Sequence, residues 1–306
     1  MKILVTGGAG FIGSHIVDRL ISEGHEVAII DNLSTGRIEN LNRKAEFYKM
    51  DIVSPRIEKV FKKERPELIC HLAAQMDVRK SVADPAYDAQ TNIIGMLNLL
   101  ENGMRYGTRR VIFASTGGAV YGEGGPIPTP ETCPPGPVSP YGISKLTGEH
   151  YLFFYKVTYG LSYVALRYAN VYGPRQDPFG EAGVVAIFAQ KLLKNEQPVI
   201  NGNGMQTRDY VYVDDVVDAV TSAVYSDISD ILNVGTGIET SVNQLFRHLV
   251  EITGSSAREV YGPAKKGEQA RSCLSYDKIR KALEWEPKVP LQEGLSRTVA
   301  FFRDRQ

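Results

Sequence analysis

Residues 3–15 read Ile-Leu-Val-Thr-Gly-Gly-Ala-Gly-Phe-Ile-Gly-Ser-His, an apolar run that leads directly into Gly7, Gly10 and Gly13. Where a strand turns sharply into a helix that binds a pyrophosphate, three positions favour glycine because it has no side chain. They are the tight turn, the point where the backbone approaches the pyrophosphate, and the point where the helix packs on the strand. The free N–H groups at the start of a helix over residues 11–23 would face the anion. This stretch therefore predicts a phosphate-binding turn at the edge of a parallel sheet.

An acidic residue follows the glycines at the sequence spacing expected of a ribose-binding carboxylate. The next predicted strand, residues 26–30, ends at Asp31. A carboxylate about 20 positions beyond such glycines can accept a hydrogen bond from the adenosine ribose, and its charge disfavours a 2′-phosphate. The turn, the helix and the acid together predict that the cofactor is NAD rather than NADP.

Composition narrows the class of protein. The 306 residues are 43% hydrophobic, enough for one large or two modest domains. Lys plus Arg equals Asp plus Glu at 35 each, which predicts neither a nucleic-acid nor a membrane partner. The three cysteines, Cys70, Cys133 and Cys273, are widely spaced and odd in number, and the histidines show no ligand spacing. We therefore expect no disulfide framework, no metal and a cytoplasmic protein, and no leader or membrane span is recognisable.

Short apolar strands alternate with helical segments through the first half of the chain. This alternation is typical of an α/β protein with a doubly wound parallel sheet, whose strand carboxyl ends and ligand lie at one edge. The predicted strands are residues 2–5, 26–30, 46–49, 68–71, 110–114 and 163–167, and the predicted helices are residues 11–23, 53–64, 89–106 and 144–159. Residues 122–140 hold seven prolines, which exclude a helix or central strand and favour a lid or substrate-side loop over a linker.

Tyr141 and Lys145 are four positions apart, so on a helix they share one face. The positive charges of Lys145 and of a nicotinamide would lower the pKa of the Tyr141 phenol and favour a base. Ser115 and Thr116 end a predicted strand at the same sheet edge, and either hydroxyl could bind the substrate oxygen. Of the two, Thr116 is the preferred partner of Tyr141.

At this point the chain resembles the extended short-chain dehydrogenases/reductases that modify nucleotide sugars, a branch of the NAD-dependent epimerase/dehydratase family, and most closely the UDP-glucose 4-epimerases. The matching segments cover nearly the whole chain. They are residues 6–13, 31–32, 51–52, 71–75, Asn92, 115–116, 120–122, 141–145, 167–175 and 202–210.

The resemblance implies a Rossmann-type fold, with a NAD-binding domain over residues 1–169 to which later segments return, and a smaller substrate region over residues 170–306. The NAD site would comprise Gly7, Gly10, Phe11, Ile12, Gly13, Asp31, Asn32, Leu33, Ser34, Thr35, Gly36, Asp51, Ile52, Leu72, Ala73, Ala74, Gln75, Asn92, Tyr141, Lys145 and Tyr168. The catalytic residues would be Tyr141, Lys145, Thr116 and Ser115. The UDP-sugar would contact Thr116, Tyr141, Asn170, Arg208, Tyr210, Arg271 and Ser272.

Two arginines are physically suited to a diphosphate, because a guanidinium is a planar, permanently charged fork. Arg208 is favoured over Arg271, since residues 265–268, Lys-Lys-Gly-Glu, carry lysines where many relatives have an arginine. The implied reaction is 4-epimerisation of a UDP-hexose, UDP-glucose or UDP-galactose, through a transient 4-keto sugar. Tyr141 would act as acid and base.

Other substrates, other reactions of the family and a non-catalytic role are the alternatives to this function. The substrate could instead be UDP-N-acetylglucosamine or UDP-glucuronate, and a small Ser272 beside the sugar 2-substituent motivates acceptance of N-acetylated sugars. A 4,6-dehydratase or decarboxylase is disfavoured, because Gly117 and Gly118 stand where those relatives carry acids. A non-catalytic NAD sensor is disfavoured by the retained Tyr141 and Lys145. The resemblance also implies a homodimer that pairs the helices at residues 92–106 and 144–159 in a four-helix bundle.

Overall fold

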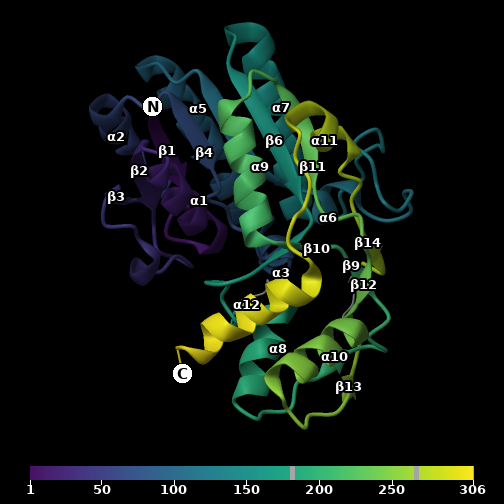
Figure 1. Ribbon diagram of the computed structural model, residues 1–306. Helices are drawn as coiled ribbons and strands as arrows, with labels where there is room; N and C mark the ends of the chain where they lie inside the picture. The colour runs from purple at the N-terminus through teal and green to yellow at the C-terminus, as the bar shows by residue number, and fades with distance from the viewer. Residues whose placement is uncertain (180–182, 265–268, 306) are drawn as a thin grey trace.

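The apolar run before Gly7 forms β1, an inner strand of a seven-stranded parallel sheet (Figure 1). The computed structural model describes residues 1–179, 183–264 and 269–305, so the lysine-containing segment 265–268 lies outside the described residues. The strand order is β3-β2-β1-β4-β5-β6-β11. The strands are β1 (Lys2–Thr6), β2 (Glu26–Asp31), β3 (Glu46–Lys49), β4 (Leu68–His71), β5 (Arg110–Thr116), β6 (Ser162–Tyr168) and β11 (Asp230–Val234). A doubly wound parallel sheet is confirmed.

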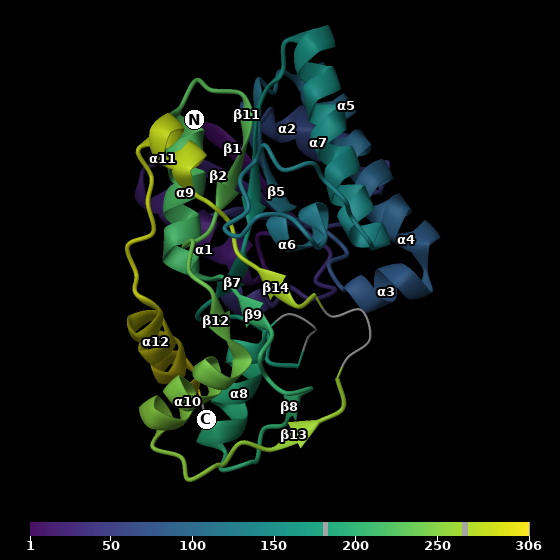
Figure 2. The ribbon, with the colours of Figure 1, turned by 90° about the vertical axis from the view of Figure 1, so that its right-hand side faces the viewer.

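Helices cover both faces of the sheet, as Figure 2 shows edge-on. One face carries α1 (Phe11–Ser22), α9 (Val213–Tyr225) and α11 (Asp277–Leu283), and the other carries α2 (Ile57–Glu64), α5 (Gly95–Tyr106) and α7 (Pro140–Tyr159). Each layer buries an apolar stripe, such as Ile16 and Leu20 of α1 on one side and Leu152 of α7 on the other. The strands are therefore buried on both faces, which explains their continuous apolar sequences.

A third core lies beyond the carboxyl ends of the strands, in the lower part of Figure 1. It joins α8 (Val184–Leu193), α10 (Val242–Thr253) and α12 (Leu291–Arg303). The short strands of this region are β7 (Asn170–Tyr172), β8 (Ile200–Asn201), β9 (Thr207–Arg208), β10 (Tyr210–Tyr212), β12 (Thr240–Ser241), β13 (Tyr261–Gly262) and β14 (Arg271–Ser272). The chain crosses back to the main sheet for α9, β11 and α11, so the two parts exchange segments.

The short elements at the strand ends shape the space between the two parts. They are the 3-10 turn η1 (Ile38–Asn40), α3 (Val78–Ala83), α4 (Pro85–Ala89), the π turn η2 (Gln90–Ile94) and α6 (Gly117–Tyr121). Single π turns within helices are frequent at functional sites. Here η2 joins α4 to α5 without a break in the chain's helical path.

All six predicted strands and four predicted helices are present, but three helices begin elsewhere. The helix predicted over residues 53–64 begins at Ile57, because the Asp51 side chain accepts the Val53 N–H and holds a turn there. The helix predicted over residues 144–159 begins at Pro140, where proline suits the first turn and Ser139 caps the Gly142 N–H at 3.2 Å.

The helix predicted over residues 89–106 is preceded by α4 and interrupted by η2. Residues 122–138 contain neither helix nor regular strand, as the prolines predict, although Pro140 itself opens α7.

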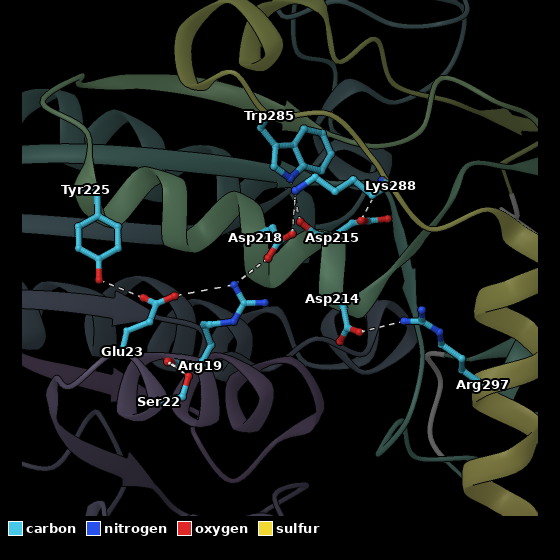
Figure 3. A network of polar contacts seen from close by, with 10 residues as sticks. All are labelled: Arg19, Ser22, Glu23, Asp214, Asp215, Asp218, Tyr225, Trp285, Lys288 and Arg297. Carbon is cyan, nitrogen blue, oxygen red and sulfur yellow. Dashed lines mark hydrogen bonds and ion pairs between the residues drawn. The ribbon is translucent and has the colours of Figure 1, made fainter.

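Polar contacts tie α1 to α9 and α9 to the C-terminal segments (Figure 3). Arg19 of α1 pairs with Asp218 of α9 at 2.8 Å. The buried Asp215 carboxylate accepts the Lys288 N–H, and its carbonyl oxygen accepts the indole N–H of Trp285. This network fixes the glycine-motif helix against a helix from the second half of the chain. In the described part of the chain, no helix combines the length and apolar character needed to cross a bilayer.

Candidate active site

A cavity of about 440 Å³ lies where the carboxyl ends of β1, β2, β4, β5 and β6 meet the C-terminal part of the chain. Its lining comes from the glycine turn, the loops after β2 and β4, the end of β5, the first turns of α7 and the segment after β6. The predicted residues in its lining are Gly7, Gly10, Phe11, Ile12, Gly13, Asp31, Asn32, Ser34, Thr35, Asp51, Ile52, Leu72, Ala73, Ala74, Gln75, Ser115, Thr116, Tyr141, Lys145, Tyr168 and Asn170.

The glycine turn has no room for side chains. Gly7 has a φ of 74°, and a Cβ there would lie 2.8 Å from the Ala73 nitrogen. A Cβ on Gly13 would lie 2.1 Å from the Gly7 carbonyl oxygen, so the helix packs directly on the turn. The helix α1 begins after Gly10 without a side-chain cap, which leaves its first N–H groups directed at the cavity. These residues fit the pyrophosphate of a dinucleotide.

Asp31 is held in place beside the glycine turn. One carboxylate oxygen accepts the Ala9 N–H at 3.0 Å and the other accepts the Leu33 N–H at 2.8 Å. Each carboxylate oxygen can accept more than one hydrogen bond, so both keep capacity for ribose hydroxyls. The Asn32 side chain donates to Asp51 at 2.9 Å, which joins the loops after β2 and β3. The order of these groups fits an adenosine.

Three predicted cofactor residues are outside the cavity lining. Leu33 has a φ of 61° and forms the turn that Asp31 caps. Gly36 lies against Asp31, where a Cβ would come 2.8 Å from its carboxylate. Asn92 is buried and bonds both the N–H and the carbonyl of Gln75, at 2.8 and 2.9 Å. These residues shape the wall of the cavity from behind.

Tyr141 and Lys145 lie side by side on the first turns of α7. The Lys145 ammonium is 5.8 Å from the centre of the Tyr141 ring and donates to the Ala114 carbonyl at 2.7 Å. Burial lowers the Lys145 pKa to about 8, although the charges of Asp88 and Glu149 act to raise it. Tyr141 therefore has a cation at hand in the geometry expected of a proton-transferring phenol.

The expected lowering of the Tyr141 pKa involves a bound nicotinamide as well as Lys145, and the chain alone does not produce it. Burial raises the pKa of this phenol, and the nearby Asp88 carboxylate raises it further. Desolvation disfavours the charged phenolate. A positively charged ligand beside the ring is what remains to favour the tyrosinate.

The two candidate hydroxyls at the end of β5 differ in their availability. Ser115 donates to Glu149 at 2.6 Å, and Glu149 is in turn paired with Arg167 at 2.6 Å in a fully buried ion pair. Thr116 accepts the Ala119 N–H over a long 3.4 Å and lines the cavity. Its hydroxyl proton remains to be donated, which favours Thr116 over Ser115 as the partner of a substrate oxygen.

The predicted substrate residues are spread more widely. Asn170 lines the main cavity, whereas Arg208, Tyr210, Arg271 and Ser272 do not. Tyr210 is buried in the C-terminal core with its ring edge against Tyr172, so its side chain packs rather than faces the cavity. Arg208 lies on β9 next to Ser272 of β14 in the register of that sheet. The structure thus brings Arg208 and Ser272 together, and it pairs Tyr210 of β10 with Asn170 of β7 through the backbone.

Arg271 and Ser272 line a second, smaller cavity of about 230 Å³. Its opposite wall is the proline-rich loop, through Gly122, Glu123 and Thr129. Thr129 exchanges backbone hydrogen bonds with Cys273 and Ser275, which ties the loop to β14. Arg271 is exposed and bound to Glu239, with Nε donating at 2.9 Å. The loop therefore lies beside Arg271 and Ser272, two of the residues predicted to contact the substrate.

Among the residues in or near the cavity that sequence reasoning missed, three polar ones bear on its chemistry. Asp88 and Glu149 are buried carboxylates that act on Lys145, and neither stands in a recognisable motif. Gln176 lines the cavity, and within the described residues its Oε1 has no hydrogen-bond partner although its Nε2 donates to Val171. Its place just after the matched segment 167–175 was the one available signal.

Comparisons with known proteins agree with this geometry. Residues 3–235 match the model of the NAD dependent epimerase/dehydratase family. A UDP-glucose 4-epimerase from Mycolicibacterium smegmatis is 46% identical over 100% of this chain and 99% of its own.

Two solved structures extend the likeness to three dimensions. A UDP-glucose 4-epimerase from Thermotoga maritima, solved with UDP-glucose, has a TM-score of 0.98 and 55% identity over 100% of this chain and 99% of its own. A UDP-glucose 4-epimerase from Thermus thermophilus, solved as a complex with NAD, has a TM-score of 0.94 and 47% identity over 99% of both chains.

Proposed function

The chain belongs to the NAD dependent epimerase/dehydratase family, and from this premise we propose that it interconverts UDP-glucose and UDP-galactose by 4-epimerisation. The observation that carries the proposal is the arrangement of Thr116, Tyr141 and Lys145 at one end of a cavity whose other end is a glycine cradle. The substrate is a UDP-hexose and the cofactor is NAD, as in the similar enzymes with UDP-glucose and with NAD. The protein is therefore an isomerase.

The division of labour follows from the residues. When bound in the cradle, NAD would supply the hydride acceptor and donor for C4 of the sugar. Tyr141 takes the proton from the 4-hydroxyl and gives it back to the 4-keto sugar, so it serves as base and then as acid. Lys145 offsets the developing phenolate charge, and Thr116 donates to the same oxygen. The cradle from Gly7 to Gly13 and the Asp31 loop would hold the cofactor.

Inversion requires that the hexose turn over while the nucleotide stays bound. We assign the UDP anchor to Asn170, Arg208 and Arg271, with Tyr210 contributing through its backbone because its ring is buried. Arginine forks bind a diphosphate firmly and leave the sugar free to rotate. Binding energy placed on the nucleotide thus serves a reaction at the sugar.

A second reaction in the same family is disfavoured by the local sequence. Gly117 and Gly118 follow Thr116 at the end of β5, where 5,6-elimination or decarboxylation would need an acid. A Cβ on Gly117 would lie 2.5 Å from the Leu274 side chain, so a larger residue there would require Leu274 to shift. Epimerisation needs only the proton exchange at O4 that Tyr141 provides.

The same small residues bear on which sugars fit. A Cβ on Gly118 would lie 3.6 Å from the Ser272 hydroxyl, so two small residues face each other beside the smaller cavity. We propose that this space admits the 2-acetamido group of UDP-N-acetylglucosamine or its 4-epimer. In a Ser272→Tyr variant, turnover of the N-acetylated sugar should be lost and that of UDP-galactose kept. Equal loss of both activities would contradict this assignment.

We also propose that the protein is a cytoplasmic homodimer. The exposed face of α7 carries Ile143, Phe153, Phe154 and Val157, of which Val157 is 68% exposed. Such a contiguous apolar face on a long helix supports pairing with a second copy, with α5 alongside. Phe153→Glu with Val157→Glu should yield monomers in light scattering, whereas an unchanged mass would contradict the interface. The three cysteines are free, in keeping with a reducing compartment.

The decisive experiment is to incubate the purified protein with UDP-galactose, UDP-N-acetylgalactosamine and UDP-glucuronate without added NAD and to separate the products. We expect UDP-glucose from UDP-galactose, since a cofactor regenerated in each cycle can stay bound. The Tyr141→Phe variant is the control for a contaminating activity. No conversion of any sugar, with NAD then supplied, would contradict the proposed function.

A further inference from the structure

Asp88 is a fully buried carboxylate behind the Tyr141–Lys145 pair. One of its oxygens accepts the Ser144 hydroxyl at 2.6 Å, and the other accepts the side-chain amides of Gln75 and Asn92, each at 3.0 Å. All three donors are uncharged. Glu149, the other buried carboxylate near the pair, is instead matched by the Arg167 guanidinium. A buried ionised carboxylate held only by neutral donors is costly, so its retention calls for a reason.

The three donors place Asp88 at a junction of the site. Ser144 stands on α7 directly before Lys145 and three residues after Tyr141. Gln75 belongs to the loop after β4 that lines the cavity, and Asn92 belongs to the π turn η2. Asp88 thereby joins the turn that carries the reacting phenol to the loop that forms the cofactor wall.

Asp88 also provides negative charge to the pair. Asp88 lies on α4, which packs against α3, η2 and α7. Arg79 and Lys80 on α3 are exposed, and η2 holds no titratable group. Over residues 140–150, α7 carries Tyr141, Lys145, Glu149 and His150. The Asp88 charge acts on two of these, Tyr141 and Lys145, and raises the pKa of both: at Lys145 it opposes the effect of burial, and at Tyr141 it adds to that effect.

We propose that Asp88 is a positioning residue for the Tyr141–Lys145 pair, whose carboxylate keeps Lys145 charged in a desolvated site and, through Ser144, fixes the turn from which both side chains project. The proposal deepens the proposed function and rests on it, because it takes Tyr141 as the base. Its consequence is that the pH range of activity is set by a group that never touches the substrate.

The test is the pH profile of kcat/KM for Asp88→Asn, which has the same shape without the charge. Loss of the negative charge lets Tyr141 ionise and Lys145 lose its proton at lower pH. Both limbs of the bell-shaped profile should therefore move to lower pH, by about one unit. A fall in activity with both limbs unmoved would reduce Asp88 to a structural role and overturn the proposal.

Three variants separate charge from packing. Asp88→Glu keeps the charge and should keep the position of both limbs, even where kcat falls. Ser144→Ala removes one hydrogen bond but no charge, so kcat should fall without a shift. Asp215→Asn removes a different buried carboxylate, which lies outside the cavity lining in the network of Figure 3, and should leave the limbs in place. A comparable shift in any of the three would contradict the charge assignment.

A spectroscopic readout keeps this test separate from the proposed function. Ultraviolet absorbance of tyrosinate, taken as the difference between each NAD-bound protein and its Tyr141→Phe partner, reports the ionisation of Tyr141 without turnover. The midpoint should move to lower pH in Asp88→Asn, and an unmoved midpoint would overturn the proposal even in an active enzyme. If Asp88→Asn does not fold, Asp88→Ser removes the same charge. Full activity of Tyr141→Phe would instead defeat the proposed function.

Discussion

The two walls of the site are built differently. The cofactor wall, formed by the Gly7–Gly13 turn, the Asp31 loop and residues 72–75, is held by short hydrogen bonds from its own backbone. The proposed substrate wall, formed by Arg208, Arg271 and Ser272, rests on two-residue strands. There Arg271 is bound to the protein's own Glu239. The comparison teaches that the cofactor wall is preorganised, whereas part of the substrate wall must exchange partners when an anion binds.

The largest expected effect is the loss of turnover in Tyr141→Phe, which tests whether the two walls meet at one reacting group. Tyr141→Phe removes the hydroxyl that transfers the proton but keeps the ring at the meeting point of the walls. Turnover should fall by roughly 100- to 10,000-fold. Cofactor retained after gel filtration should be unchanged, because the preorganised wall is intact. Loss of bound NAD in this variant would show that the phenol also belongs to the cofactor wall.

Breaking the cofactor wall should come next in size. In Gly13→Ala the new Cβ would overlap the Gly7 carbonyl oxygen, which is backbone and cannot move aside. We expect the protein to purify without NAD and to unfold at a free energy lower by about 1–3 kcal/mol. Calorimetry and cofactor absorbance measure the two effects. The control is Gly118→Ala, whose Cβ meets nothing closer than 3.6 Å and should keep NAD bound.

The substrate wall should respond through KM rather than through cofactor binding. Arg208→Leu removes a partly buried cation and should raise KM about 10- to 100-fold, the range of a hydrogen bond to a charged group. Arg271→Leu should raise KM less, because Arg271 is exposed and already has a partner. Initial rates over a range of UDP-galactose concentrations give both values. The reverse order would mean that Arg271 is the principal diphosphate ligand.

Lys145, which lies where the two walls meet, should make the free energy of unfolding depend on pH. Its pKa of about 8 in the folded chain is below the value near 10.4 of an unfolded lysine, so the unfolded state binds more protons between these pH values. Stability of the NAD-free protein should therefore rise as pH increases from 8 to 10. Lys145→Met should stabilise it by roughly 1–3 kcal/mol at pH 7, and the gain should shrink toward pH 10. Urea unfolding at the two pH values measures this, and a pH-independent difference would contradict the depressed pKa.

The smallest expected effect is on UDP affinity and comes from the ion pair between Arg271 and Glu239. Glu239→Gln removes the carboxylate that competes for Arg271, so UDP should bind about two-fold more tightly to the NAD-bound enzyme. Titration calorimetry with UDP gives the dissociation constant. Weaker binding would mean that Glu239 orients Arg271 for the nucleotide rather than competing with it, which would bring the substrate wall closer to the cofactor wall.

Local sequence was sufficient for the cofactor wall because each of its parts is contiguous. Gly7 to Gly13, Asp31 and residues 72–75 each end a predictable strand, and parallel strands bring their carboxyl ends to one edge. The substrate wall was harder to predict, since β9 and β14 are two residues long and pair across more than 60 positions. No periodicity marks a strand of that length. Tyr210 was assigned to the nucleotide for its motif, but its burial in the third core depends on helices far along the chain.

By itself the sequence determined the doubly wound sheet. It also predicted the NAD cradle and the reacting pair Tyr141 and Lys145, because spacing along one turn or one helix defines each of them. Only the tertiary structure decided that the Ser115 hydroxyl donates to Glu149, that Arg271 forms an ion pair with Glu239, and that Asp88 lies behind the reacting pair. The physical reason is that the charge around a buried group comes from residues distant in sequence, which burial and packing bring within reach.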